Sequence, residues 1–384
     1  GMERRDPHSL GHIPDKGFHA LPHLGGRLIR EGDREDLARP GLTGLQQAGD
    51  ATGEHARLAR ARPGHDDGPV PDRSDDGGEK AAMLALDEAF VGDDLKLVVL
   101  PEYFLTSYPI GPDLPTWPAR ACLGPNGREY EALGKLAQQN DIYLSGNAYE
   151  IDPAFADLFF QISFIIAPTG DRILVYRRLI SMYTATPHDV WDRFLDLYGI
   201  EAAFPVADTP LGRLACVASE EILFPEVARA LCLRGAEILL HSSSETGSPQ
   251  LTKKGIAKRA RALENLAYVV SANSAGIAGG GIPAESTDGG SIVIDYEGRV
   301  LAEASTGESM VACSEIDPAR VRHQRQRVGM DNYLARLRTE PFASTYQQPV
   351  YPANLLRDSK PTRAGFHAAI AKSIQGLADR MKCS

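Results

Sequence analysis

The stretch that decides the fold is residues 208–244, DTPLGRLACVASEEILFPEVARALCLRGAEILLHSSS. It contains a buried-strand run at Leu214–Ala218, a helix that begins at Pro225 and ends before Gly235, and a second apolar run at Ala236–His241. Proline is favoured at the first position of a helix and glycine just after its end. A strand, a helix and a strand in this order predict one βαβ unit with two parallel strands.

The chain on both sides of this unit continues the α/β pattern from about Lys80. Hydrophobic runs and alternation predict strands at 95–100, 141–149, 158–167, 172–179, 268–273, 291–296, 300–304 and 309–316. Helical spacing predicts helices at 80–90, 128–140 and 252–267, and a last helix capped by Asp317. Thr169-Gly170-Asp171 reads as a hairpin turn, and residues 341–362, with four prolines, as an irregular segment.

Residues 1–78 differ in composition from the rest of the chain. Only 20 of these 78 residues are hydrophobic, and they hold 14 of the 37 glycines and six of the ten histidines. No period of 2 or 3.6 runs through them, so we expect a poorly ordered extension, with a partner-binding or metal-binding segment as the alternative. The sequence thus predicts this extension, an α/β domain over 79–325, and a C-terminal extension over 326–384 with an irregular proline-containing segment and a helix.

Charge and composition exclude several classes of protein. The formal net charge is −10, with 51 acidic against 41 basic residues, which argues against a nucleic-acid-binding or membrane-surface protein. No run of 18 apolar residues is present, and the opening GMERR has no hydrophobic region of a signal peptide. The five cysteines form no CxxC pair, so we expect reduced thiols in the cytoplasm and no metal site: Cys122, Cys216, Cys232, Cys313 and Cys383.

Three polar groups come directly after buried strands, where ligands bind in open α/β sheets. Glu102 follows the strand at 95–100 and is placed to be desolvated and to act as a general base. Arg178 ends the strand at 172–179, and Ser219 lies on the turn that leads to the helix at Pro225, where a nucleophile and an oxyanion hole belong. Taken singly, each residue also has a plain structural explanation as a loop-capping acid, a surface cation or a turn-capping serine.

Five stretches together resemble the nitrilase superfamily, the carbon–nitrogen hydrolases. They are LVVLPEYFLTSYP (97–109), RILVYRRLI (172–180), the stretch 208–244, RARALENLAYVVSANSAG (259–276) and GGSIVIDYEGRVLAEAS (289–305), and a TPHDVW-like segment at 186–191 is similar to one branch of the superfamily. The resemblance implies a four-layer α-β-β-α sandwich, a homodimer or higher homo-oligomer formed through a helical face, and a Glu–Lys–Cys triad without a cofactor.

The resemblance places Glu102 at the family's glutamate, but the other two triad positions depart from it. Arg178 stands where lysine is expected, and Ser219, six residues before Pro225, stands where cysteine is expected. A serine hydroxyl is a much weaker acid than a thiol, and arginine keeps the positive charge in a bulkier, planar group. The departures therefore predict slow turnover, and they predict that Ser219→Cys alone restores less activity than Ser219→Cys with Arg178→Lys.

The remaining pocket candidates follow the strands that carry the triad. For the family's further acid, the loop after Arg178 offers His188, Asp189 and Asp192, of which Asp189 is preferred. The predicted substrate-binding residues are Tyr108, Asp189, Trp191, Glu220, Ser243, Ser244 and Glu245. The resemblance implies a hydrolase for a small amide, carbamoyl compound or nitrile, with an impaired Glu-Arg-Ser site. The alternative is a non-catalytic small-molecule-binding or scaffold protein on the same fold.

Overall fold

The computed structural model describes residues 95–102, 104–105, 116–245, 251–276, 287–306 and 310–382. By its internal contacts the chain divides into two units, residues 1–54 and 55–384, and all the described residues belong to the second. The predicted extension 1–78, the predicted helix 80–90 and Tyr108 lie outside the described residues. The predictions for them therefore stay predictions.

The first sheet has the strand order β1-β2-β3-β4. β1 runs parallel to β2, and the other neighbours are antiparallel. Gly170, with a φ of +87°, forms the predicted hairpin turn between β3 and β4, a conformation that an L-residue with a Cβ rarely adopts. The bounds are β1 Leu97–Val99, α4 Arg128–Asn140, β2 Tyr143–Ile151, β3 Phe159–Ile166 and β4 Arg172–Arg177.

The second sheet has the order β10-β9-β8-β7-β6-β5, with β6, β7 and β8 parallel. Helices α6 and α7 make the crossovers between these three strands, so the βαβ unit predicted from residues 208–244 is confirmed. The bounds are β5 Ala207–Thr209, β6 Gly212–Ala218, α6 Pro225–Leu233, β7 Ile238–Ser243, α7 Lys253–Asn265, β8 Tyr268–Asn273, β9 Ile292–Ile294 and β10 Val300–Glu303.

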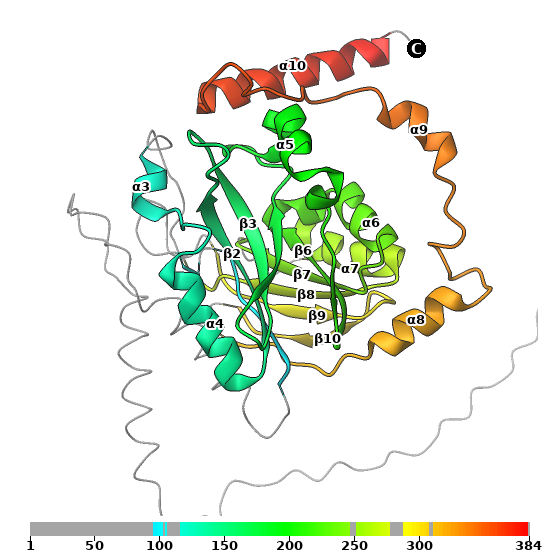
Figure 1. The fold of residues 1–384 in the computed structure, drawn as a ribbon. Coiled ribbons are helices and arrows are strands. Elements are labelled where there is room, and N and C mark those ends of the chain that lie inside the picture. Colours follow the sequence, from blue (N-terminus) through cyan, green and yellow to red (C-terminus); the bar gives the residue numbers. More distant parts are fainter. Residues whose placement is uncertain are drawn as a thin grey trace, which may run out of the picture. The chain divides into compact units, whose positions relative to one another are not determined.

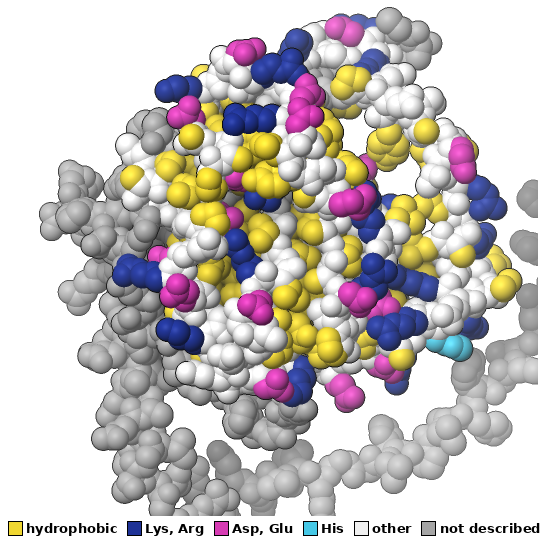
Figure 2. All heavy atoms as spheres, in the orientation of Figure 1, with side chains coloured by type: hydrophobic (Ala, Val, Ile, Leu, Met, Phe, Trp, Pro, Cys, Tyr) yellow, Lys and Arg dark blue, Asp and Glu magenta, His cyan; other side chains and the backbone are white. Residues whose placement is uncertain are grey.

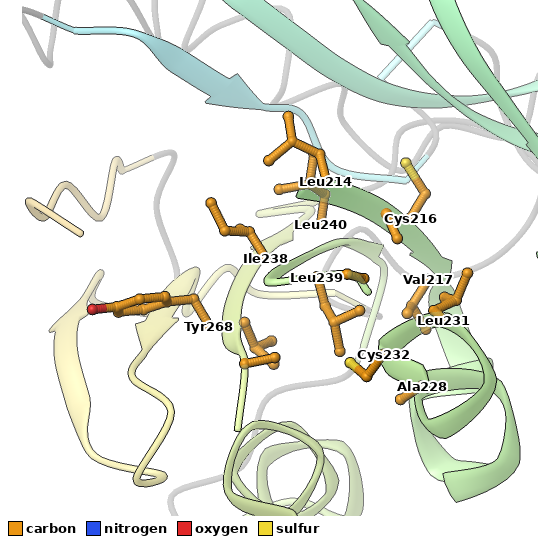
Figure 3. Close-up of a cluster of buried hydrophobic side chains, with 14 of the residues drawn as sticks. Leu214, Cys216, Val217, Ala228, Leu231, Cys232, Ile238, Leu239, Leu240 and Tyr268 are labelled. Atoms are coloured by element: carbon orange, nitrogen blue, oxygen red, sulfur yellow. The ribbon is translucent and has the colours of Figure 1, made fainter. Parts of the chain in front are cut away.

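The two sheets pack face to face between helical layers, which confirms the predicted α-β-β-α sandwich (Figure 1). Alternation along β3 divides its side chains between two cores: Phe160, Ile162 and Phe164 pack in the cluster that contains α4, whereas Ile165 packs against the second sheet. Figure 3 shows the second core, in which Leu239 of β7 and Leu231 of α6 lie among apolar neighbours.

One prediction about the C-terminal third was wrong, and a second, the irregular segment 341–362, holds only from residue 347 onward. Residues 310–316 form no strand: their burial alternates with a period of two, but within the described ranges they pair with no neighbouring strand. The predicted irregular segment begins with a helix, α9, since its one proline lies in the first turn, where it costs no hydrogen bond. The remaining elements are α3 Trp117–Ala121, η1 Pro187–Val190, α5 Trp191–Tyr198, η2 Ile200–Ala203, η3 Ser219–Leu223, α8 Pro318–Gln326, α9 Glu340–Tyr346 and α10 Arg363–Lys382.

The surface in Figure 2 carries acidic and basic side chains interspersed around apolar ones. Among the described residues, no helix has both the length and the apolar character needed to cross a bilayer. Nor do three or more histidine, cysteine or carboxylate side chains gather as metal ligands would in this part of the chain.

Candidate active site

Glu102 lies directly after β1, with its side chain fully buried between the two sheets. Gln161 of β3 donates from Nε2 to Glu102 Oε1 at 2.6 Å, and Ser244, just after β7, donates from Oγ to Oε2 at 2.6 Å. The backbone N–H of Glu102 donates to the carbonyl of Ser243 at 3.3 Å. Both sheets therefore hold the carboxylate in one orientation, as a positioned general base requires.

Arg178, the first residue after β4, lies beside this carboxylate. Its Nη1 is 3.9 Å from Glu102 Oε1, and the side chain is 9% exposed. The guanidinium donates from Nε to the carbonyl of Ile180 at 2.6 Å, from Nη1 to Gln161 Oε1 at 2.5 Å, and from Nη2 to Glu220 Oε1. All three nitrogens of the planar guanidinium thus donate to protein acceptors, which fixes the group in place.

Gln161 links the base and the cation, and sequence reasoning missed it. Because arginine can only donate, the Gln161 oxygen must face Arg178 and its amide N–H2 must face Glu102. The same amide nitrogen donates to Asn147 Oδ1 of β2 at 3.0 Å. The signal was present in FFQISFII (159–166), where polar residues alternate with apolar ones inside a fully buried strand. A buried polar residue with period two faces the layer between the sheets, where Glu102 lies.

Ser219 begins the turn after β6 in a left-handed conformation, with a φ of +48°. His241 of β7 donates from Nε2 to the Ser219 carbonyl at 2.8 Å, and Ser271 bonds to its Nδ1 at 2.8 Å. Burial lowers the pKa of His241 well below its ordinary value, so the ring is neutral with its proton on Nε2. The Oγ of Ser219 makes no hydrogen bond to another described residue. The backbone is therefore held while the hydroxyl stays available.

Strain at Ser219 makes a testable contribution to stability. A non-glycine residue in the left-handed region costs on the order of 1 kcal/mol. We expect Ser219→Gly to raise the free energy of unfolding by about 1 kcal/mol, whereas Ser219→Ala, which keeps a Cβ, gives no such gain. Urea denaturation of the two variants measures the difference, and equal stabilities would contradict it.

Cys216, three residues before Ser219, does not replace the absent nucleophile. Its side chain is fully buried in β6, and burial raises the pKa of the thiol to about 12. A protonated thiol in the core is not a nucleophile, which leaves Ser219 as the candidate.

Glu221 connects the turn that carries Ser219 with the turn that carries Arg178 through hydrogen bonds. Its Oε1 accepts the backbone N–H groups of Leu179 at 2.7 Å and Ile180 at 3.0 Å. Its Oε2 accepts the Tyr176 hydroxyl at 2.7 Å. Burial raises the pKa of this fully buried carboxyl to about 7. Its neighbour Glu220 was predicted from the sequence as a substrate-binding residue, whereas Glu221 was not.

Two lysines of α7 also reach the site and were not predicted. Lys258, 2% exposed, pairs with Glu245 at 2.5 Å. Lys254 donates from Nζ to Ser243 Oγ at 3.0 Å. Burial lowers the pKa of Lys254, and the charges of Glu102 and Glu245 oppose that shift. Of the predicted pocket residues, Glu220 therefore contacts Arg178, and Ser243 and Ser244 contact Glu102. Glu245 contacts Lys258 of α7 instead.

Asp189 and Trp191 have local partners instead. Asp189 Oδ2 accepts the Thr186 backbone N–H at 2.9 Å and the Thr186 hydroxyl at 2.8 Å in a capping box. Trp191 stacks on Phe194 with ring centroids 5.9 Å apart. A TPHDVW-like segment thus serves the start of α5, and its hydrogen bonds do not connect it with Glu102.

A surface groove of about 720 Å³ lies elsewhere, between residues 153–158, α5 and residues 354–361. Aspartate, arginine and lysine side chains of both signs line it, and none of the residues around Glu102 does. The groove and the candidate site are therefore separate, and the buried acid–base cluster, not the groove, has the chemistry of an active site.

Comparisons with known proteins relate the chain to carbon–nitrogen hydrolases. A family model described as carbon-nitrogen hydrolase matches residues 72–326. A formamidase of Pseudomonas syringae pv. tomato is 27% identical over 241 residues, which are 62% of this chain and 65% of that protein. The chain thus spans less than two thirds of that relative's length. A formamidase of Bacillus thuringiensis is 26% identical over 255 residues, covering 65% of this chain and 70% of that protein.

Solved structures give the same picture of the fold. A carbon-nitrogen hydrolase from Helicobacter pylori superposes with a TM-score of 0.55 at 22% identity, covering 73% of this chain and 95% of that chain. Saccharomyces cerevisiae Nit3, a member of branch 10 of the nitrilase superfamily, has a TM-score of 0.53 at 25% identity, covering 68% of this chain and 91% of that chain.

Proposed function

Because the chain belongs to the carbon–nitrogen hydrolase family of the nitrilase superfamily, we propose that it hydrolyses a short amide, slowly, at Glu102, Arg178 and Ser219. The observation that carries the proposal is the fully buried Glu102 carboxylate, clamped between both sheets beside a cation. Similarity to formamidases favours small amides over the nitriles and carbamoyl compounds that the superfamily resemblance also allows.

The residues divide the reaction as follows. Glu102 accepts the Ser219 proton while Oγ attacks the amide carbon, and the same carboxyl returns the proton to the leaving nitrogen as the C–N bond breaks. Water then hydrolyses the acyl-serine ester by the reverse sequence of proton transfers. No step needs a cofactor. Turnover is slow because a serine hydroxyl is a weak acid and a carboxylate is a weak base for it.

The rate of ammonia release tests this proposal. We expect the full chain to release ammonia from formamide or acetamide at below about 1 s⁻¹, the lower end of ordinary enzymatic rates. Ser219→Ala, which preserves the fold, is expected to abolish that release, so it serves as the control for a contaminating amidase. Parallel assays with ω-amides, N-carbamoyl compounds and nitriles define the substrate class. A faster rate would refute the impaired site, and release that survives Ser219→Ala would refute the nucleophile.

A specific observation favours the second candidate, a non-catalytic amide-binding protein. The two Glu102 oxygens already accept from Gln161 and Ser244, and Ser219 Oγ is bonded to neither oxygen. Saturable binding of formamide without ammonia release would select this alternative.

The homo-oligomeric state and the cytoplasmic location are also proposals. Exposed apolar side chains on α6 and α7, such as Leu233 and Ile256, favour subunit pairing at these helices.

A further inference from the structure

We propose that Lys254, and not Arg178, supplies the cation that contacts the carbonyl oxygen of the bound amide. This inference rests on the proposed function and deepens it, since it assigns a substrate-contacting residue that lies outside the family's triad positions. Three observations carry it: the hydrogen bonds that hold Arg178 to the protein, the N–H donors of Lys254 that have no acceptor among the described residues, and the contact of Lys254 with Ser243, which binds the backbone of the base.

Arg178 cannot turn toward a ligand without losing several bonds. Its Nε, Nη1 and Nη2 donate to the Ile180 carbonyl, Gln161 and Glu220. The guanidinium is rigid and planar, so redirecting one N–H moves the others away from their acceptors. The arginine is therefore a positioning residue that holds Gln161 and, through it, Glu102.

The Lys254 ammonium uses only one of its N–H donors within the described residues. An ammonium carries three N–H donors, and within the described part of the chain Lys254 uses one, to Ser243 Oγ at 3.0 Å, with no carboxylate in ion-pair distance. Its neighbour on the same helix, Lys258, is instead committed to Glu245 at 2.5 Å. Desolvation of Lys254 without a matched counter-ion leaves it poised for an oxygen that gains negative charge.

Lys254 contacts or influences residues that hold both the base and the nucleophile. Ser243, its partner, accepts the Glu102 backbone N–H at its own carbonyl, so the lysine lies beside the strand that carries the base. In the register of β6 and β7, Ala218 is opposite Ser242. Ser219 therefore begins the turn after β6 next to Ser243, the last residue of β7. The charge of Lys254 also lowers the pKa of His241, whose ring holds the Ser219 carbonyl.

Helix stability does not explain this lysine. Lys254 is the second residue of α7, and a positive charge in the first turn faces the positive end of the helix dipole. A carboxylate there would be more favourable for the helix. The ammonium instead lies at Ser243, where the charges of Glu102 and Glu245 favour its protonated form.

The step assigned to Lys254 is a hydrogen bond in the transition state. As Ser219 Oγ bonds to the carbonyl carbon, the π pair of the C=O bond moves to the oxygen and the hydroxyl proton moves to Glu102. The Lys254 ammonium donates to that oxygen and keeps its own protons. When the oxygen's pair re-forms the C=O bond, the nitrogen leaves with the proton from Glu102.

Kinetics of two matched variants test the assignment. Lys254→Gln is expected to lower kcat for formamide about 100-fold, the usual effect of losing one oxyanion donor, with KM changed less than threefold. Lys253→Gln, the exposed neighbour in the same turn, is expected to leave both constants unchanged. Lys254→Arg, which keeps a charged donor, is expected to recover part of kcat. An unchanged kcat in Lys254→Gln, with turnover in the parent chain, overturns the inference and leaves the proposed function standing.

Contact with the ligand is tested independently of turnover. In chain labelled with carbon-13 at lysine Cε, formamide is expected to shift the Lys254 signal saturably and to leave the Lys253 signal in place. The two signals are assigned by their loss in Lys254→Arg and Lys253→Arg. A Lys254 shift without ammonia release supports the inference while refuting the catalytic function. An unmoved Lys254 signal at saturating formamide overturns the inference.

Discussion

Replacing Glu221 with alanine is expected to lower the free energy of unfolding by about 3 kcal/mol, although Glu221 is not one of the predicted triad residues. Its carboxyl accepts from the backbone N–H groups of Leu179, Ile180 and Ala218 and from the Tyr176 hydroxyl. Each buried donor left without an acceptor costs roughly 1 kcal/mol or more. Urea denaturation at pH 6 measures the loss. A cost below about 1 kcal/mol would contradict the role of Glu221 in joining the two turns.

A single-contact variant and a pH series sharpen this expectation. Tyr176→Phe removes one of the four donors and is expected to cost about 1 kcal/mol. The folded pKa of Glu221, about 7, is raised above its ordinary 4.5, so its stabilising contribution is complete below about pH 4.5 and is lost as the pH rises through 7. The cost of Glu221→Ala is therefore expected to be smaller at pH 8 than at pH 6. A cost that is the same at pH 6 and pH 8 would show that the buried carboxyl is ionised throughout this range.

The sequence predicted the layers of the fold because they follow from periodicity. The apolar runs within β6 and β7 and the proline and glycine at the ends of α6 define the βαβ unit without any knowledge of its neighbours. The strand expected at 310–316 was wrong for a different reason. Period-two alternation describes one extended segment, but a strand also needs a hydrogen-bonded partner, and a single segment of sequence does not contain that information.

The sequence predicted strand-end residues of the site and missed those that lie inside elements. Glu102 and Ser219 could be found because they directly follow apolar runs. Gln161 lies in the middle of β3 and Lys254 in the first turn of α7, where a polar residue ordinarily reads as a local irregularity or a solvated face. Their roles depend on how two sheets and a helix are packed, which no local pattern specifies.

Ser219→Cys is expected to raise ammonia release from formamide about 100-fold or more, without any change at Arg178. A thiol has a pKa near 8.5, so a carboxylate base can ionise it far more readily than a hydroxyl. The sequence suggests that Arg178→Lys is also needed, because the family has a lysine there. The hydrogen bonds of Arg178 to Gln161 and Glu220 change that expectation, since a shorter, single-headed ammonium would abandon them.

Three variants separate these explanations in one assay. If Lys254 supplies the cation, adding Arg178→Lys to Ser219→Cys changes the rate less than threefold, while adding Lys254→Gln removes most of the gain. If the substrate-binding cation must instead be a lysine at position 178, only the double variant Ser219→Cys with Arg178→Lys reaches ordinary rates of about 1 s⁻¹ or more. Steady-state ammonia release distinguishes these outcomes, and urea denaturation checks that each variant folds.

A Ser219→Cys chain that folds and binds formamide but releases no ammonia would place the defect at Glu102, whose two oxygens already accept hydrogen bonds from Gln161 and Ser244. Ser244→Ala, which removes the hydrogen bond to Oε2 and leaves that oxygen to accept the thiol proton, would then be the change that restores turnover.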